Sequence, residues 1–286
     1  MQKIILFGGT GNLGKKIAEE LQRKGYNTTA VVRSDAKAAE ISHLVSECII
    51  ADVTQPQSLR GFCEGFDAVI SSLGKSVSLN DKSKPSFAEI DFNGNANILA
   101  EAIQANVKKF VYVSALHADK LQHLEYFRAH YQFEEKLKAS GIDYSIIRPP
   151  AIFSAFIDLI PMAQKGRLVN MGKGDKKTNP IYEGDLAAIC VDALHQSNVV
   201  IEPGGKEVLT RKQINHIIQQ VVNPKKKIRT VPVGMIKALL PLVKLTSRNT
   251  YDKMAFYTEV IQQDVIAEPV GETTLDTYIR QKAQSH

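Results

Sequence analysis

The sequence has few cysteines and no sign of a disulfide framework. Its three cysteines, Cys48, Cys63 and Cys190, are odd in number and far apart, which argues against paired bridges and against a zinc motif. We therefore expect core thiols and a reducing compartment. The N-terminus enters a strand pattern by Lys3 without the apolar stretch of a signal peptide, which predicts a cytoplasmic protein.

The sequence also lacks a long uninterrupted apolar run. Its most apolar late segment, 233–245, is broken by Lys237, Pro241 and Lys244, so we expect no transmembrane segment. The pattern of this segment is that of an amphipathic helix. Two roles stay open for it, covering a substrate pocket or contacting a quinone-bearing membrane.

A charged tail and an arginine-rich stripe are absent as well. The formal net charge of +6 comes from 36 Lys and Arg spread along the chain against 30 acidic residues. A cofactor phosphate or a mildly acidic substrate explains this surplus as well as nucleic acid does. The one dense basic cluster, 225–227 followed by Arg229, is more typical of a solvated turn than of a nucleic-acid or anionic-membrane contact. We expect a small-molecule substrate and no nucleic acid.

Short apolar runs alternate with amphipathic stretches over the first 150 residues, the order typical of βαβ units. Strands are expected at 3–7, 28–32, 48–51, 68–71, 110–114 and 144–148, and helices at 12–24, 36–46, 57–63, 87–105 and 125–140. Gly25 and Gly141 stand where helices end. The pattern predicts an α/β fold, a Rossmann-type doubly wound parallel sheet with a smaller C-terminal substrate-side lobe.

The alternation becomes irregular after Pro150, with turn residues clustered from 165 to 180. We expect about 151–178 and 204–286 to form the smaller lobe. The segment 179–194, in which Asp185 opens a helix, returns to the first domain, which then comprises 1–150 plus about 179–203.

A glycine-rich loop, GGTGNLG, follows the first strand at once and opens the first helix. It fits G-x-G-x-x-G from Gly9 or G-x-x-G-x-x-G from Gly8. Glycine permits positive φ, a close approach of the backbone to a pyrophosphate and close packing of helix on strand, and the helix N-terminus favours phosphate. A structural turn without ligand is the alternative. The expected dinucleotide-binding residues here are Gly8, Thr10, Gly11, Asn12, Leu13 and Gly14.

The second strand ends in Arg33 and Ser34, where an NAD-preferring site usually has an acid that binds the ribose hydroxyls. A guanidinium can pair with a 2′-phosphate and stack on adenine, so these residues favour NADP(H). Asp35 keeps NAD(H) open, because a shift of two residues would make it the ribose acid.

Two further strand ends carry candidate cofactor contacts at the carboxyl edge of the sheet. Asp52 and Val53 end the third strand, where the carboxylate can meet the adenine amino group or can instead only cap the following helix. Ser71, Ser72 and Leu73 end the fourth strand beside the expected nicotinamide half.

Over nearly its whole length the chain resembles the atypical short-chain dehydrogenase/reductase family, in its NmrA-like, NAD(P)H-binding branch. The matching stretches are 8–14, 91–105 with 107–114, 140–149, and 179–181 with 185–187. The resemblance implies that Pro149 and Ile152 contact the cofactor. It also implies an aromatic or quinone-like substrate pocket near Phe153 and Met171, although an ordinary lobe core would give the same pattern.

Typical members of that family end strand five with a serine and carry Tyr-x-x-x-Lys on the next helix, where a spacing of four places both side chains on one face. Ser114 and Tyr126 fill the first two positions, but His130 stands where the lysine should be. The candidate catalytic residues are therefore Ser114, Tyr126 and His130, with His130 either a proton relay or a polar residue on a structural helix. The neighbouring His117 and His123 have no acid pattern to complete a metal site, so none is expected.

The leading hypothesis is an NADP(H)-dependent oxidoreductase acting on a small carbonyl or quinone-like acceptor. A non-catalytic NADP(H)-binding redox sensor or assembly protein is the alternative, because the Tyr-x-x-x-Lys couple is incomplete. A nucleotide-sugar epimerase is weaker, since that reaction depends on both residues. The sequence names neither the substrate nor the oligomeric state, monomer or homodimer.

Overall fold

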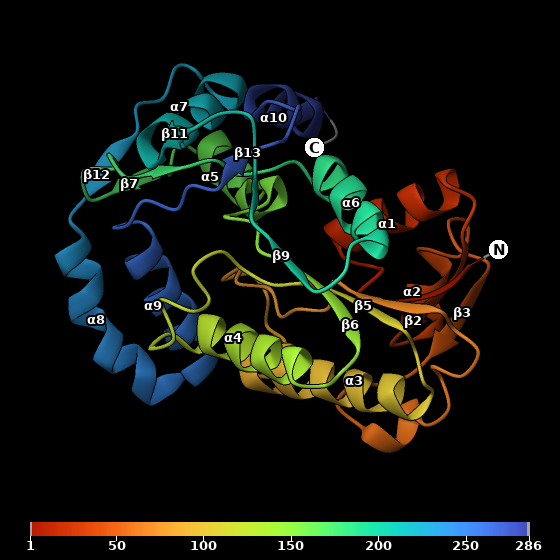
Figure 1. Ribbon diagram of the computed structural model, residues 1–286. Coiled ribbons are helices and arrows are strands. Elements are labelled where there is room, and N and C mark those ends of the chain that lie inside the picture. Colours follow the sequence, from red (N-terminus) through yellow and green to blue (C-terminus); the bar gives the residue numbers. More distant parts are fainter. Residues whose placement is uncertain (1, 285–286) are drawn as a thin grey trace. The chain divides into compact units, whose positions relative to one another are not determined.

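The computed structural model describes residues 2–284 and divides the chain into two compact units (Figure 1). The first comprises Met1–Lys75, Pro85–Arg148 and Glu183–Ile201, and the second comprises Ser76–Lys84, Pro149–Tyr182 and Glu202–His286. The short excursion 76–84, which no pattern in the sequence marks, belongs to the second unit.

Seven parallel strands form the sheet of the first unit, in the order β3-β2-β1-β4-β5-β6-β9. They are β1 (Lys3–Phe7), β2 (Asn27–Val32), β3 (Glu47–Ile50), β4 (Ala68–Ser71), β5 (Lys109–Val113), β6 (Asp143–Ile147) and β9 (Val199–Ile201). The order reverses direction between β1 and β4, and such a switch point is where open α/β sheets bind ligands. The predicted Rossmann-type doubly wound sheet is confirmed.

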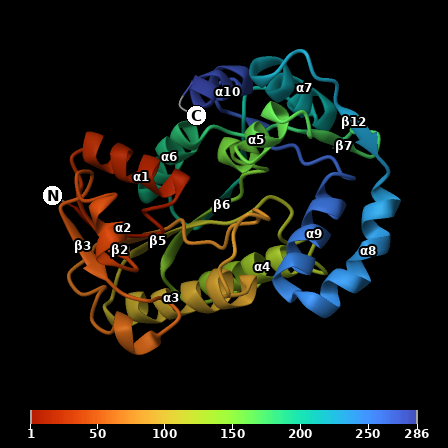
Figure 2. The same ribbon diagram turned by 180° about the vertical axis from the view of Figure 1, so that it is seen from behind.

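Helices cover both faces of this sheet (Figures 1 and 2). On one face α1 (Asn12–Arg23) packs against α6 (Glu183–Asp192), which continues into η4 (Ala193–His195). On the other lie η1 (Pro56–Leu59), η2 (Ala88–Gly94), α3 (Asn95–Gln104) and α4 (Glu125–Lys138), while α2 (Asp35–Ala39) follows β2. Because successive strand residues point to opposite faces, a strand covered on both sides needs consecutive apolar residues, as β1 has from Ile4 to Phe7.

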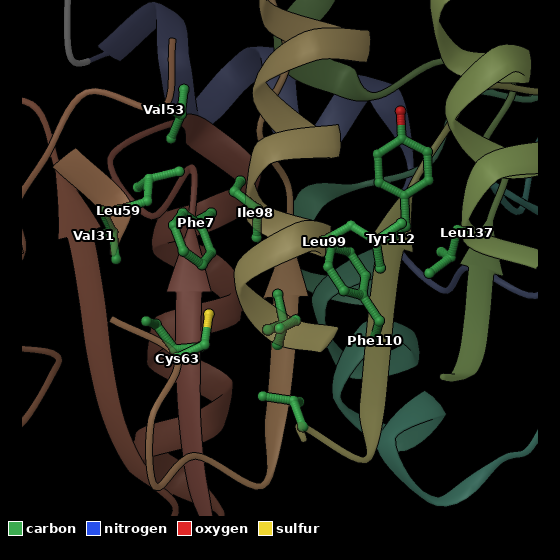
Figure 3. Close-up of a cluster of buried hydrophobic side chains, with 14 of the residues drawn as sticks. Phe7, Val31, Val53, Leu59, Cys63, Ile98, Leu99, Phe110, Tyr112 and Leu137 are labelled. Carbon is green, nitrogen blue, oxygen red and sulfur yellow. The ribbon is translucent and has the colours of Figure 1, made fainter. Parts of the chain in front are cut away.

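The core on the α3 and α4 face is shown in Figure 3. Alternate residues of the central strands supply it, among them Phe7 of β1, Val31 of β2 and Phe110 and Tyr112 of β5. Ile98 and Leu99 of α3 pack onto them. Cys63 also lies in this core, and burial raises the pKa of its thiol to about 12.

Three predicted helices differ from the structure. The one expected at 36–46 ends at Ala39 and turns follow, because fully buried Ile41 and the bond from Ser46 N to Thr28 O draw the chain back to the sheet. The one expected at 57–63 is a 3₁₀ turn, since Gly61 has a left-handed φ of 78°.

The helix expected at 87–105 begins as the π-helix η2 and becomes α-helical only at Asn95. The side-chain amide of Asn95 donates to the carbonyl of Asp91 at 2.9 Å, and this carbonyl would accept a backbone bond in an α-helix. Single-turn π segments of this kind are frequent at functional sites.

The second unit is built from short strand pairs and helices. Its strands are β7 (Val169–Met171), β8 (Lys177–Thr178), β10 (Pro203–Gly204), β11 (Leu209–Thr210), β12 (Arg229–Val231) and β13 (Glu268–Pro269), paired as β12-β7, β11-β8 and β10-β13. Its helices are η3 (Phe153–Phe156), α5 (Leu159–Gln164), α7 (Arg211–Val222), α8 (Val233–Thr246), α9 (Arg248–Val260) and α10 (Leu275–Gln284). Phe153 is buried in the core of this unit, so it serves there as core rather than as an open pocket wall.

Candidate cofactor site

The glycine loop 8–14 has the geometry of a dinucleotide-binding turn. Gly8 has a φ of 79°, and the N–H of Gly11 donates to its carbonyl at 3.1 Å. A Cβ on Gly8 would lie 2.6 Å from the carbonyl carbon of Ser72, and one on Gly14 would lie 2.1 Å from the oxygen of Gly8. Both neighbours are backbone, so no side chain can be accommodated at either position.

The N-terminus of α1, directly after this loop, is open. Gly11 is its N-cap and offers no side-chain cap, and the first turn holds no acidic residue. Its first N–H groups therefore lack the internal acceptor that a serine or aspartate cap would supply. Gly11 and Asn12 are exposed, whereas Leu13 is buried beneath them. A cradle of glycine backbone before an uncapped helix N-terminus fits a pyrophosphate.

The end of β2 carries the residues predicted to select the cofactor. Arg33 is exposed, and it has no hydrogen bond or ion pair with the rest of residues 2–284. Ser34 is the N-cap of α2, and its hydroxyl accepts from the N–H of Lys37 at 3.4 Å. Asp35 lies in the first turn of that helix. The guanidinium of Arg33 is thus available to an anion, while the hydroxyl of Ser34 caps α2 and the carboxylate of Asp35 is exposed in its first turn.

The end of β3 is held by a turn. One oxygen of Asp52 accepts from both the N–H and the hydroxyl of Thr54, at 2.9 and 2.7 Å. Val53 is buried in the core. The carboxylate of Asp52 is exposed and keeps its second oxygen for another donor, so the capping role and the adenine role are compatible.

The end of β4 is tied to its neighbours. The hydroxyl of Ser71 donates to Asn95 Oδ1 at 2.6 Å, and that of Ser72 donates to the carbonyl of Phe7 at 3.3 Å. The N–H of Leu73 donates back to Ser71 at 3.4 Å. These bonds fix the strand end beside the carboxyl end of β1, where the glycine loop begins.

Ser114, the first predicted catalytic residue, is buried and bonded within the protein. Its hydroxyl donates to Glu134 Oε1 at 2.5 Å. Glu134 is fully buried and forms an ion pair with Arg148, whose Nε donates to the same oxygen at 3.0 Å and whose Nη2 donates to the other. Asp119 lies 3.7 Å from Arg148 Nη1. Ser114 therefore belongs to a buried ionic cluster at the ends of β5 and β6.

His130, which stands in place of the usual lysine, is buried as well. Its Nδ1 pairs with the hydroxyl of Tyr112 at 2.6 Å, and its Nε2 lies 3.5 Å from Asp91 Oδ1. Burial lowers the pKa of His130 to about 3, so its imidazole is neutral at pH 7. Burial also raises the pKa of Asp91. The carboxyl oxygen of Asp91 that faces His130 accepts from the N–H of Lys75 at 3.1 Å. Of the two roles open for His130, this geometry favours the structural one.

Tyr126, the third predicted catalytic residue, is half-buried. Its ring makes edge contacts with Phe87, Phe127 and His130 at centroid distances of 5.5, 5.0 and 4.6 Å. Of the three candidates it is the only one that is not buried, and no lysine stands at its i+4 position.

Sequence reasoning missed the partners Tyr112, Asp91, Glu134 and Arg148. One signal was present, because Glu134 follows His130 by four residues and so lies on the same face of α4. The two remaining cofactor candidates, Pro149 and Ile152, belong to the second unit, where Ile152 forms an isolated bridge with Ile181. Among residues 2–284 no group of three or more potential metal ligands gathers.

Comparison with known proteins gives a family match that includes the glycine loop. A family described as NAD(P)H-binding matches residues 8–197. The photosystem II assembly factor Ycf39 of Trieres chinensis is 23% identical over 282 residues, which cover 96% of this chain and 86% of that protein. The chloroplastic divinyl chlorophyllide a 8-vinyl-reductase of Arabidopsis thaliana is 29% identical over 258 residues, which cover 82% of this chain and 60% of that protein.

Among solved structures, an NADPH-dependent quinone oxidoreductase of Escherichia coli in complex with NADPH superposes with a TM-score of 0.73 at 21% identity. The match covers 97% of this chain and 99% of that one. At this identity the likeness concerns the fold alone.

Proposed function

This chain belongs to the NAD(P)H-binding family, and on that premise we propose that it is an NADP(H)-dependent oxidoreductase acting on a small quinone-like or carbonyl acceptor. The observation that carries the proposal is the backbone cradle of Gly8 and Gly14 before the uncapped N-terminus of α1. When bound, the nicotinamide supplies a hydride. Relatives whose names describe a reductase and a quinone oxidoreductase support the reaction class.

The preference for NADP(H) rests on Arg33. Its exposed, unpaired guanidinium follows β2, where it can bind a 2′-phosphate through a charge-assisted bond. No carboxylate stands at that position, and Asp35, the nearest one, lies two residues further on in the first turn of α2. NAD(H) should therefore bind more weakly than NADP(H).

A quinone suits this chain better than a simple ketone. The chain has no lysine four residues after Tyr126, so the ammonium group of the usual couple is missing from that position. Reduction of a ketone leaves a strongly basic alkoxide, whereas reduction of a quinone leaves a far weaker base that needs less help from an acid. In this proposal Tyr126 donates the proton, while Ser114 and His130 position β5 and α4.

Binding is tested by titrating cofactor-free protein with NADPH and NADH while following the melting temperature and the heat of binding. Loss of one charge-assisted bond of about 1.5–3 kcal/mol should weaken NADPH binding roughly 10- to 150-fold in Arg33→Ala and leave NADH unchanged. Arg60→Ala removes an exposed arginine elsewhere in the same unit and serves as the control. Equal affinity for both cofactors would refute the assignment of Arg33.

Turnover is tested by following NADPH oxidation with a panel of quinones, aldehydes and ketones. We expect activity with quinones, and Tyr126→Phe should reduce kcat more than the affinity for NADPH. Tight binding of NADPH without turnover on any acceptor would refute the oxidoreductase and leave the cofactor assignment standing.

A second function, a non-catalytic NADP(H)-binding protein that acts through a partner, is favoured by one observation. Ser114 and His130 are both buried and engaged in internal hydrogen bonds. A relative is named as an assembly factor, which supports the same class. The acceptor panel distinguishes the two functions, because this one requires cofactor binding with no turnover.

A further inference from the structure

Helix α8 presents an uncovered apolar face. None of its 14 residues is buried. Four large apolar side chains are more than half exposed, at 63% for Met235, 54% for Leu239, 62% for Leu242 and 84% for Leu245. At about 100° per residue these four share one side of the helix. Such a contiguous set differs from the single apolar residues that are normal on a protein surface.

The opposite side of α8 is already used. The helix packs against α9 within the second unit, and Lys237 forms an ion pair with Glu259 of that helix at 3.6 Å. The apolar residues Ile236, Leu240 and Val243 are only half-buried. The exposed face therefore remains after α8 has made its own tertiary contacts.

The positive charge of the chain is concentrated in the stretch of sequence that contains this helix. Residues 208–251 contain nine Lys and Arg and no Asp or Glu. Since the chain has 36 Lys and Arg, 27 remain elsewhere against all 30 acidic residues. The entire positive surplus therefore lies in this stretch. Eight of its nine cations are exposed, namely Lys212, Lys225, Lys226, Lys227, Arg229, Lys237, Lys244 and Arg248.

We propose that α8 docks the protein on an anionic phospholipid surface, with the helix lying in the plane of the interface. The four apolar side chains would enter the headgroup boundary, and the surrounding cations would meet lipid phosphates. The flexible aliphatic part of each lysine side chain allows its ammonium group to reach the lipid phosphates while the helix axis lies deeper in the interface. This inference does not rest on the proposed enzymatic function.

The length of α8 decides between lying on a bilayer and crossing it. Its 14 residues span about 21 Å, whereas the hydrocarbon core is about 30 Å thick. Among residues 2–284 no helix has the length and apolarity that a membrane span requires. A second copy of this chain is a poorer occupant, because a two-fold contact would bring two stretches of like charge together.

Flotation of the purified protein with lipid vesicles tests the proposal. We expect binding to vesicles containing phosphatidylglycerol and much weaker binding to pure phosphatidylcholine. Each lysine contributes about 1 kcal/mol at an anionic surface, so changing Lys225, Lys226 and Lys227 to glutamine should weaken binding about a hundredfold. The double variant Leu242→Glu/Leu245→Glu should bind anionic vesicles at least ~tenfold more weakly. Ile266→Glu, at a side chain 43% exposed outside α8, is the control.

A spectroscopic test is available because the chain contains no tryptophan. In Leu242→Trp the single indole should shift its emission to the blue on adding anionic vesicles, whereas Val270→Trp, at another exposed position, should not shift. Failure of the wild-type protein to float, equal binding to neutral vesicles, or binding unaffected by the paired glutamates would each overturn the proposal. Self-association that the glutamates abolish, without vesicle binding, would instead identify α8 as a contact between copies.

Discussion

Replacing Glu134 by glutamine should strongly destabilise the first unit, because this carboxylate is fully buried and carries three hydrogen bonds. It accepts from Ser114 at 2.5 Å and from two nitrogens of Arg148, one of them at 3.0 Å. Glutamine keeps the shape but removes the charge, and its amide group places donors against the donors of Arg148. Arg148 is only 8% exposed, so its guanidinium would become a poorly compensated buried charge.

Removing one partner of a buried ion pair costs about 3–5 kcal/mol. At roughly 2–4 °C per kcal/mol for domains of this size, the melting temperature should fall by roughly 6–20 °C. Equilibrium urea unfolding measures the free-energy change directly, and an unchanged m-value would show that the unfolded state is not altered.

The adjacent Glu135 provides a matched control for this experiment. Its side chain is 50% exposed and pairs with Lys138 at 2.8 Å on the solvent side of the same helix. Glu135→Gln should cost less than about 1 kcal/mol, as exposed pairs do. If the two variants differ by less than about 1 kcal/mol, the buried cluster does not stabilise the fold as argued.

Three further predictions concern the loop and the buried His130–Asp91 pair. Gly14→Ala should lower the melting temperature and weaken NADPH binding by more than ~tenfold. Gly11→Ala should keep the wild-type melting temperature, because its Cβ would come no closer than 3.4 Å to the chain. Calorimetry measures the melting temperature and the affinity. Because the pKa of His130 falls from 6.5 to about 3 on folding, stability should be lost as pH drops below about 6.5, by up to roughly 5 kcal/mol, and urea unfolding of His130→Gln should show a flatter profile. The raised pKa of Asp91 has the opposite effect, because folding then costs more free energy as the pH rises above the ordinary pKa of the carboxyl. Asp91→Asn should therefore stabilise the protein more at pH 7 than at pH 4. An equal effect at both pH values would contradict a neutral Asp91 in the folded protein.

The sheet could be predicted from the sequence because buried parallel strands are apolar on both faces. The limits of β1 and β4 match the predicted runs. β2 begins one residue earlier than predicted, and β3, β5 and β6 each begin and end one residue earlier than predicted. The edge strand β9 was not identified, since three residues carry too little pattern. The early end of α2 and the π-turn of η2 depend on Ile41 and Asn95, whose partners lie elsewhere in the fold.

Of the candidate site, too, one part could be predicted from the sequence and another could not. The glycine loop was predictable because the spacing of its glycines and its position between strand and helix already specify the turn. The partners of Ser114 and His130 could not be predicted. A sequence can place a polar residue at a strand end or on a helix face, but it does not show which buried group that residue contacts. Glu134 lies 20 residues from Ser114, and only the pairing of β5 with β6 brings Arg148 to it.

The packing of α1 against α6 has a consequence for biosynthesis. The apolar stripe of α1, formed by Leu13, Ile17, Ala18 and Leu21, is made early, but α6 begins only at Glu183. At 5–20 residues per second, roughly 10 to 30 seconds of translation separate the two. During that interval the part of α1 that α6 will cover stays exposed on the nascent chain. Because α1 also contacts β1 and β2, a chain released before α6 would keep only the α6-facing part of α1 uncovered. The yield of folded protein therefore depends on completing synthesis as well as on final stability.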